Sequence, residues 1–187
     1  MVVTIVTRKG RVTKIPYISD SHRAWLSKSL DDLIEFVGWN LYLMGSREDT
    51  FYHIIYRLLD VFYGNGESYT LSIPPHDPEK RELVEKKLRP LIDTIKSNPP
   101  LLDKKNGTLN YVVCRILNAF YPREHSRYAD LNNAIGVLET ALREAKVEFS
   151  KRYEANGMIR CAMLEVYRRK VAPYEQDACD LQGDVFD

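Results

Sequence analysis

Arginine and tyrosine side chains recur at helical spacing in this chain, and they are the residue types best suited to bind an anion. Tyr111, Arg115 and Asn118 follow an i, i+4, i+7 pattern, so one helix face would present all three. Asn110 lies beside them, and Arg57 holds the position of Arg115 58 residues earlier. A guanidinium group is a planar set of donors that matches phosphate or carboxylate. The pattern indicates a pair of anion-binding arginines. Arginines that cap a loop carbonyl or pair with an acidic residue of the next helix would fit the same pattern.

Two further polar segments are candidates for the same site. Asp130 and Asn133 open a predicted long helix, where such side chains either cap the helix or contact a ligand. Arg168, Arg169 and Tyr174 combine cations with an aromatic ring, a set that can hold phosphate while stacking a base. The alternative for this second segment is a solvated helix end with basic residues in its last turn.

Residue patterns of known catalytic sites are missing from the sequence. It contains no glycine-rich phosphate loop, nucleophile elbow or His-Glu-x-x-His motif. Glu144 and Glu148 share a helix face, as do Asp32 and Glu35, but neither pair is flanked by the further acids that a magnesium site needs. The three cysteines lack Cys-x-x-Cys spacing, which favours reduced thiols over a zinc site. We therefore expect no catalytic residue, no metal ligand and no cofactor.

Composition narrows the class of protein. The chain has 187 residues, 44% of them hydrophobic, which is enough for one buried core. Its 27 basic and 26 acidic residues nearly cancel, which disfavours nucleic acid as a partner. No apolar run approaches the length of about 20 residues that a membrane-spanning helix needs, so we expect a soluble protein without a membrane partner.

Two segments of the chain repeat one another. Residues 15–63 and 73–121 align without a gap at an offset of 58, with 14 identities in 49 positions. Such a repeat predicts a pseudo-symmetric helical body, the covalent counterpart of a homodimer, and leaves homo-oligomerisation of the whole chain open. The predicted fold class is mainly α, a helical bundle built from a tandem duplicated helix-pair unit.

Local patterns place the elements of this bundle. Residues 1–14 predict a short N-terminal β-hairpin with Gly10 at its turn. Apolar periodicity predicts helices over residues 20–37, 48–63, 78–95, 109–121, 129–156 and 158–171. Pro90 predicts a kink or break, Thr108 a helix cap, and Gly157 an interruption.

These elements predict a single fused domain over residues 1–187. Its parts are the hairpin at 1–14, a degenerate first repeat at 15–72, a second repeat at 73–128, long C-terminal helices at 129–175 and a flexible tail at 176–187.

Four stretches of the second half carry a resemblance to a known family. They are Gly-Thr-Leu-Asn-Tyr-Val at 107–112, Tyr-Ala-Asp-Leu-Asn-Asn-Ala-Ile-Gly-Val-Leu-Glu at 128–139, Glu-Val-Tyr-Arg-Arg-Lys-Val-Ala-Pro-Tyr-Glu at 165–175 and Gly-Asp-Val at 183–185. Over residues 73–187 the chain resembles small uncharacterised helical proteins found mainly in bacteriophage and metagenomic sequences. It departs from them at Thr108, where an acidic residue is usual, and in extra residues near 140–156. The resemblance implies a viral origin and a helical fold.

These observations favour a phage-type, non-catalytic protein of the host cell cytoplasm. It would sequester a small anionic, nucleotide-derived ligand, such as a bacterial immune signalling molecule, as a counter-defence. One alternative is a protein–protein interaction module that inhibits a host protein through a patch including Trp39, Tyr42 and Met44. A third hypothesis is a metal-dependent nucleotide pyrophosphohydrolase.

Overall fold

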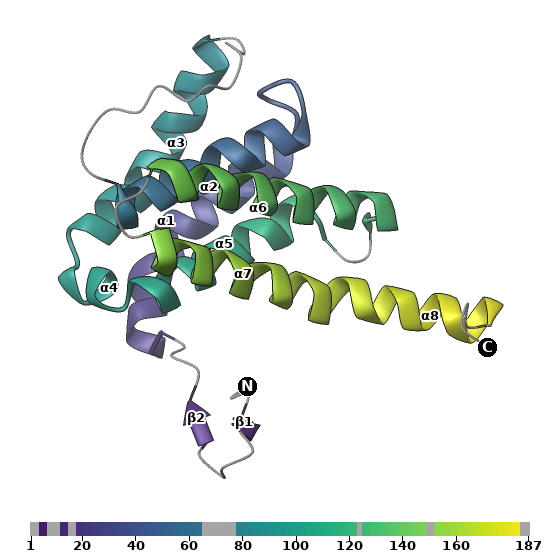
Figure 1. The fold of residues 1–187 in the computed structure, drawn as a ribbon. Coiled ribbons are helices and arrows are strands. Elements are labelled where there is room, and N and C mark those ends of the chain that lie inside the picture. The colour runs from purple at the N-terminus through teal and green to yellow at the C-terminus, as the bar shows by residue number, and fades with distance from the viewer. Residues whose placement is uncertain are drawn as a thin grey trace.

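The computed structural model is mainly helical, which confirms the fold class at that level (Figure 1). It describes residues 4–6, 12–14, 18–64, 78–122, 125–148 and 152–183. Near the N-terminus, strands β1 (Thr4–Val6) and β2 (Val12–Lys14) pair antiparallel. Gly10, the predicted turn residue, lies outside the described residues.

The first two helices are α1 (Asp20–Trp39) and α2 (Arg47–Tyr63). Ser19 caps α1 by accepting a hydrogen bond from the backbone of His22, and Ser46 caps α2 by accepting from the backbone of Asp49. Helix α1 buries one apolar stripe, whereas α2 is buried on most of its sides. In α1 the stripe is Leu26, Leu30, Leu33 and Val37, whereas the neighbouring Trp25 is exposed.

The next three helices are α3 (Pro78–Lys96), α4 (Pro99–Asp103) and α5 (Lys105–Phe120). The predicted break at Pro90 is absent from α3, because Pro90 faces solvent while its neighbours Leu88 and Leu91 are buried. The predicted loop after α3 contains the short helix α4. Thr108 is not a cap but lies inside α5, where its hydroxyl donates to the carbonyl of Leu101 at 2.9 Å and ties α5 to α4.

The helix bounds of the two segments correspond closely. Helix α3 begins 58 residues after α1, and α5 begins 58 residues after α2. Asn40 after α1 and Asn98 after α3 both donate a side-chain hydrogen bond to the carbonyl four residues back, at 2.8 Å and 2.6 Å. Helices α1 and α3 are therefore both followed by an asparagine whose side chain donates a hydrogen bond to the last turn of the helix.

The C-terminal part comprises α6 (Tyr128–Glu148), α7 (Arg152–Val166), the π-helix η2 (Tyr167–Val171) and α8 (Ala172–Gln182). Gly157 lies within α7 and does not interrupt it, since the helix continues on both sides. The predicted flexible tail is helical as far as Gln182; Pro173 falls in the first turn of α8, where its missing N–H costs no hydrogen bond. Helices α7, η2 and α8 follow one another as a long rod whose α8 end projects beyond the bundle (Figure 1).

Packing interleaves the helices of the two predicted repeats. Helix α1 packs against α3 and α5, while α2 packs against α5, α3 and α6. Phe51 of α2 meets Phe120 of α5 with ring centroids 5.2 Å apart, and both rings are fully buried at the centre of the core. Helix α7 covers α5 and α6. None of the described helices combines the length and apolar character that crossing a membrane requires.

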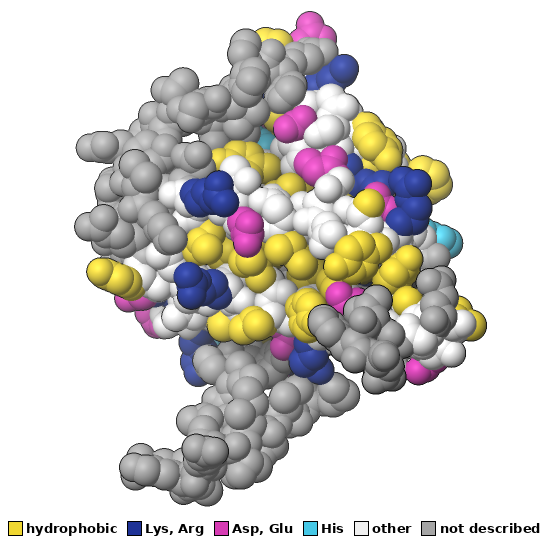
Figure 2. Space-filling view, turned by 45° about the vertical axis from the view of Figure 1, so that its right-hand side comes forward, with side chains coloured by type: hydrophobic (Ala, Val, Ile, Leu, Met, Phe, Trp, Pro, Cys, Tyr) yellow, Lys and Arg dark blue, Asp and Glu magenta, His cyan; other side chains and the backbone are white. Residues whose placement is uncertain are grey.

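The surface seen in Figure 2 is mixed. Hydrophobic side chains gather in a band across the helical body, with single basic and acidic side chains on either side of it.

Candidate functional site

The structure places Arg57 in a partly buried ion-pair network. Its Nε lies 2.7 Å from Glu85 of α3, and its Nη1 lies 3.0 Å from Asp60. The fully buried His53 places Nε2 2.9 Å from the same Glu85 carboxylate. Burial alone would raise the pKa of Glu85, but the hydrogen bond with His53 and the charge of Arg57 outweigh it and lower the pKa to about 2. The guanidinium of Arg57 therefore binds the protein's own carboxylates.

Asp130 and Asn133 hold α6 to α2. The backbone N–H of Arg127 donates to Asp130 at 2.8 Å, and this bond, with the charge of Arg47, lowers the pKa of the Asp130 carboxyl. Asp130 lies 3.7 Å from Arg47 at the start of α2. Asn133 donates to Glu48 at 3.1 Å. Both candidates therefore make contacts that fix the position of two helix N-termini.

Tyr174 and Arg168 also contact other residues of the protein: Tyr174 packs against α6, and Arg168 pairs with a carboxylate of α7. The ring of Tyr174 lies 5.8 Å from that of Tyr128, whose hydroxyl is 3.5 Å from Glu175. Arg168 donates to Glu165 at 2.9 Å. Neither Tyr174 nor Arg168 lines the pocket described next.

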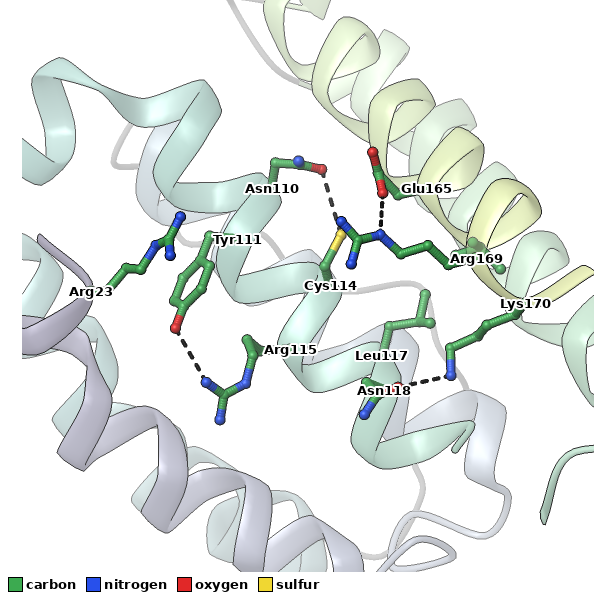
Figure 3. Close-up of a pocket in the computed structure, with 11 residues that line it drawn as sticks. Arg23, Asn110, Tyr111, Cys114, Arg115, Leu117, Asn118, Glu165, Arg169 and Lys170 are labelled. Carbon is green, nitrogen blue, oxygen red and sulfur yellow. Dashed lines mark hydrogen bonds and ion pairs between the residues drawn. The ribbon is translucent and has the colours of Figure 1, made fainter. Parts of the chain in front are cut away.

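Four of the predicted residues, Asn110, Tyr111, Arg115 and Arg169, do come together around a pocket of about 540 Å³. The first three lie on α5, which forms the pocket floor, and Arg169 reaches it from η2 (Figure 3). The rest of the lining is Arg23 from α1, Cys114, Leu117 and Asn118 from α5, Glu165 and Val166 from α7, and Lys170 from η2. The pocket is thus a depression over α5 between α1 and the α7–η2 rod.

On the α1 side, two guanidinium groups flank one aromatic ring. Arg23 lies 5.6 Å and Arg115 lies 6.0 Å from the ring centroid of Tyr111, within cation–π range. Arg115 also donates to the Tyr111 hydroxyl at 3.2 Å and to Asp31 of α1 at 2.7 Å. The Asp31 side chain is 56% exposed, so this ion pair is open to water and to competing anions.

On the η2 side, two cations stand on consecutive residues of a π-helix. Arg169 donates through Nε to Glu165 at 2.5 Å. Lys170 is only 7% exposed, and its ammonium donates to Asn118 at 2.9 Å and to the carbonyl of Tyr121 at 2.5 Å. The wider turn of a π-helix changes the side-chain spacing from that of an α-helix, and here Lys170 turns inward while Arg169 stays exposed at the pocket.

The electrostatics of the pocket favour an anion. Among the described residues that line it, four are cationic (Arg23, Arg115, Arg169 and Lys170) and one, Glu165, is a carboxylate. Burial would raise the pKa of Glu165, but hydrogen bonds from Arg168 and Arg169 lower it, so this group is ionised. Burial raises the pKa of the Cys114 thiol to about 12, which leaves it protonated and the floor uncharged.

Local patterns indicated only part of the remaining lining. Asn118 lies on the predicted α5 face with Tyr111 and Arg115, and Lys170 adjoins Arg169. Arg23 and Glu165 lie on helices far away in the sequence, and no local pattern relates them to α5. Among the described residues, no group of three or more His, Cys, Asp or Glu could hold a metal ion; the side chains of Glu144 and Glu148 lie outside that set.

Comparison with known proteins gives one family match. Residues 73–156, less than half of the chain, match a family described as Domain of unknown function (DUF6899). No curated protein and no solved structure matches the chain. The matched segment contains α3 to α6 and the start of α7, so it includes the pocket floor on α5, whereas Arg23 and Arg169 lie outside it.

Proposed function

We propose that this protein is a non-catalytic binding protein whose pocket over α5 holds a small anionic, nucleotide-derived ligand. The observation that carries the proposal is the lining of four cations against one carboxylate around about 540 Å³. Pockets for small molecules commonly enclose about 300–1,000 Å³. Positively charged, partly buried side chains recognise phosphate through charge-assisted hydrogen bonds.

The neutral lining supports the nucleotide part of the proposal. The amides of Asn110 and Asn118 can both donate and accept hydrogen bonds, as the edge of a base requires. Tyr111 and the guanidinium groups beside it offer flat surfaces for a base. Sequestration requires tight binding alone, and the counter-defence role in a host cytoplasm rests on the resemblance to bacteriophage proteins over residues 73–187.

We further propose that the bundle arose by tandem duplication of a helix pair. The equal 58-residue displacement of α3 from α1 and of α5 from α2 supports this origin. So do the arginines at matching positions: Arg57 of α2 pairs with Glu85 of α3, and Arg115 of α5 pairs with Asp31 of α1. In both cases the second helix of one repeat bonds to the first helix of the other.

Isothermal titration calorimetry with cyclic dinucleotides, cyclic ADP-ribose isomers, NAD and mononucleotides tests the binding function. We expect at least one of these anions to bind, and to be recovered intact by mass spectrometry. Arg115→Gln and Arg169→Gln should each weaken its binding by about tenfold to a hundredfold, because each removes a charged hydrogen-bond donor.

Two matched arginine variants serve as controls for that titration. Arg143→Gln changes an exposed side chain of α6 away from the pocket and should leave the affinity unchanged. Arg57→Gln should lower the stability of the fold but not the affinity, since Arg57 does not line the pocket. Equal loss of binding in Arg57→Gln and Arg115→Gln would contradict the assignment of the pocket.

Docking on a host protein is the second candidate function, and one observation favours it. Trp39 at the end of α1 is 84% exposed, and large exposed aromatic side chains are typical of binding surfaces. Met44 was predicted to share this patch but is buried, because its segment folds back against the core. Tyr42 is exposed, and its hydroxyl accepts from Arg47. A titration in which no anion binds would favour this second function.

A further inference from the structure

A group of tyrosines lies outside the pocket, where the start of α6 meets the C-terminal rod. The ring of Tyr128 lies 5.8 Å from that of Tyr174, with the two planes tilted by 37°. Tyr167 of η2 donates to the carboxylate of Glu175 at 3.1 Å, and the Tyr128 hydroxyl lies 3.5 Å from the other oxygen of that carboxylate. Side chains of α6, η2 and α8 therefore meet beside one acidic group. We call Tyr128, Tyr167, Tyr174 and Glu175 the tyrosine cluster.

The rings of the tyrosine cluster are open to water. Tyr128, Tyr167 and Tyr174 are 40%, 48% and 42% exposed, whereas Tyr121 of the core is fully buried. Packing against the core therefore does not account for the three rings. The face of an aromatic ring carries partial negative charge, and an exposed face attracts cations.

The carboxylate of Glu175 adds a full negative charge to this surface. Within the described part of the chain, its hydrogen-bonding and ion-pair partners are the two tyrosine hydroxyls and no cation. Arg168 and Arg169 of η2 both donate to a carboxylate of α7, and Arg127, which precedes Tyr128, pairs with a carboxylate of α6. Helix α8 itself contains three acidic residues and no Lys or Arg. The charge around the rings is therefore suited to a cation from outside the chain.

The surroundings of Glu175 favour one kind of cation. Both of its oxygens already face tyrosine hydroxyls, so the carboxylate contributes charge more than a free hydrogen-bond acceptor. A lysine ammonium is compact and strongly hydrated, and aromatic rings do not replace the water that it loses. A methylated ammonium keeps the positive charge, and its methyl groups pack against ring faces. The second kind of cation fits these residues better.

We propose that the tyrosine cluster binds a methylated ammonium group, either that of a choline-type molecule or that of a trimethylated lysine side chain. The methyl groups rest on the exposed rings, and the charge lies beside Glu175. None of the four residues lines the pocket over α5. The inference is therefore independent of the proposed anion-binding function.

A charged probe and an uncharged probe of the same shape test the role of charge. The charged probe is choline, and the uncharged probe is the alcohol in which a tert-butyl group replaces the trimethylammonium group. We expect titration calorimetry to give at least about tenfold tighter binding for choline, because the rings and Glu175 attract only the cation. Equal binding of the two probes would reduce the cluster to an apolar surface and overturn the proposal.

Variants assign the binding to the tyrosine cluster. Tyr174→Leu removes a ring, and Glu175→Gln removes the charge with little change in shape. Each should weaken choline binding by about threefold to tenfold, while Glu175→Gln should leave binding of the uncharged probe unchanged. The matched controls are Tyr153→Leu, at an 87% exposed ring of α7, and Asp180→Asn, more than one turn further along α8. Both controls should keep the affinity of the unaltered chain, and circular dichroism melts show that each variant is folded.

Two peptides distinguish the sources of the methylated ammonium. They are glycine–serine peptides with either trimethyllysine or unmethylated lysine at the same position. Tighter binding of the trimethylated peptide than of choline would identify a group carried by a protein, and the reverse order would identify a free small molecule. The inference is wrong if the unmethylated peptide binds as tightly as the trimethylated one, or if neither choline nor the trimethylated peptide binds. Either result leaves the anion pocket, which uses other residues, untouched.

Discussion

Arg57 and Arg115 occupy matching sequence positions, but their ion-pair partners differ in exposure to solvent. Arg57 meets Glu85, whose side chain is 24% exposed and also touches the buried His53. Arg115 meets Asp31, whose side chain is 56% exposed, at the edge of a pocket. Partial burial of Glu85 and its bond to His53 make the first pair part of the fold, whereas the second pair is more exposed, which is why we propose that its guanidinium binds a ligand.

The Glu85 network predicts a loss of stability in acid. The pKa of Glu85 is lowered from 4.5 to about 2, because its bonds to His53 and Arg57 outweigh burial. A carboxyl group with a depressed pKa contributes stability that is fully present above its unfolded value and is lost as the pH falls through the folded value. We expect the free energy of unfolding, measured with urea, to fall between pH 5 and pH 2 by on the order of 3 kcal/mol from this group.

Two variants isolate that contribution. Glu85→Gln should be less stable at pH 7 and should lose less free energy of unfolding than the unaltered chain as the pH falls. Asp31→Asn removes a carboxylate from an exposed pair and should keep nearly the full acid dependence. An unchanged pH dependence in Glu85→Gln would show that other carboxyl groups dominate acid unfolding.

At the scale of the element, the π-helix η2 is the part of the C-terminal rod that is hydrogen-bonded to the end of α5. Its inward residue, Lys170, donates to Asn118 in the last turn of α5 and to the carbonyl of Tyr121 just after that helix. The carbonyls at a helix C-terminus lack partners within the helix, and a cation there also meets the negative end of the helix dipole. Lys170 therefore acts as a C-terminal clamp on α5 as well as a wall of the pocket.

This clamp makes Lys170 more important for stability than its neighbour Arg168. Lys170→Met keeps the length of the side chain but leaves a buried carbonyl and an amide oxygen without their donor, so the free energy of unfolding should fall by about 1–3 kcal/mol. Arg168→Met, in the same π-helix, removes one exposed ion pair with Glu165 and should cost less than about 1 kcal/mol. Urea unfolding of both variants makes the comparison, and equal losses would rule out the clamp.

At the scale of the whole molecule, the two proposed repeats interlock. Helix α1 packs against α3 and α5, and α2 packs against α5 and α3, so the apolar face of each first-repeat helix meets second-repeat helices. The central contact, Phe51 with Phe120, also joins the two repeats. A helix pair with its apolar face exposed cannot offset the conformational entropy of folding.

Fragment 1–72 should therefore fail to fold alone. We expect its circular dichroism to lack a cooperative thermal transition, and a mixture with fragment 73–187 to recover helicity and a transition. The matched control is the full chain cut between residues 72 and 73 after folding, which should stay associated in gel filtration. A cooperative transition in fragment 1–72 by itself would contradict the interlocked arrangement.

Sequence periodicity predicted the helices well where one apolar stripe faces the core. The start of α1 after Ser19 is an example, because a capping serine and a buried stripe are both local signals. Predictions from single residue types failed where the surrounding structure overrides them. Thr108 resembles a cap, yet its hydroxyl bonds to Leu101 from inside α5, and Pro90 resembles a helix breaker, yet the buried residues beside it keep α3 continuous.

The sequence by itself determined the helical class and the polar face of α5 that carries Tyr111 and Arg115, because these depend on residues within a few turns of one another. Only the tertiary structure decided which helices flank that face. The packing of the helices brings Arg23 and Arg169 to the pocket, whereas Arg57 forms an ion pair with Glu85 away from it. The physical reason is that an ion pair depends on distance and burial across neighbouring helices, and local spacing along the chain carries no information on either.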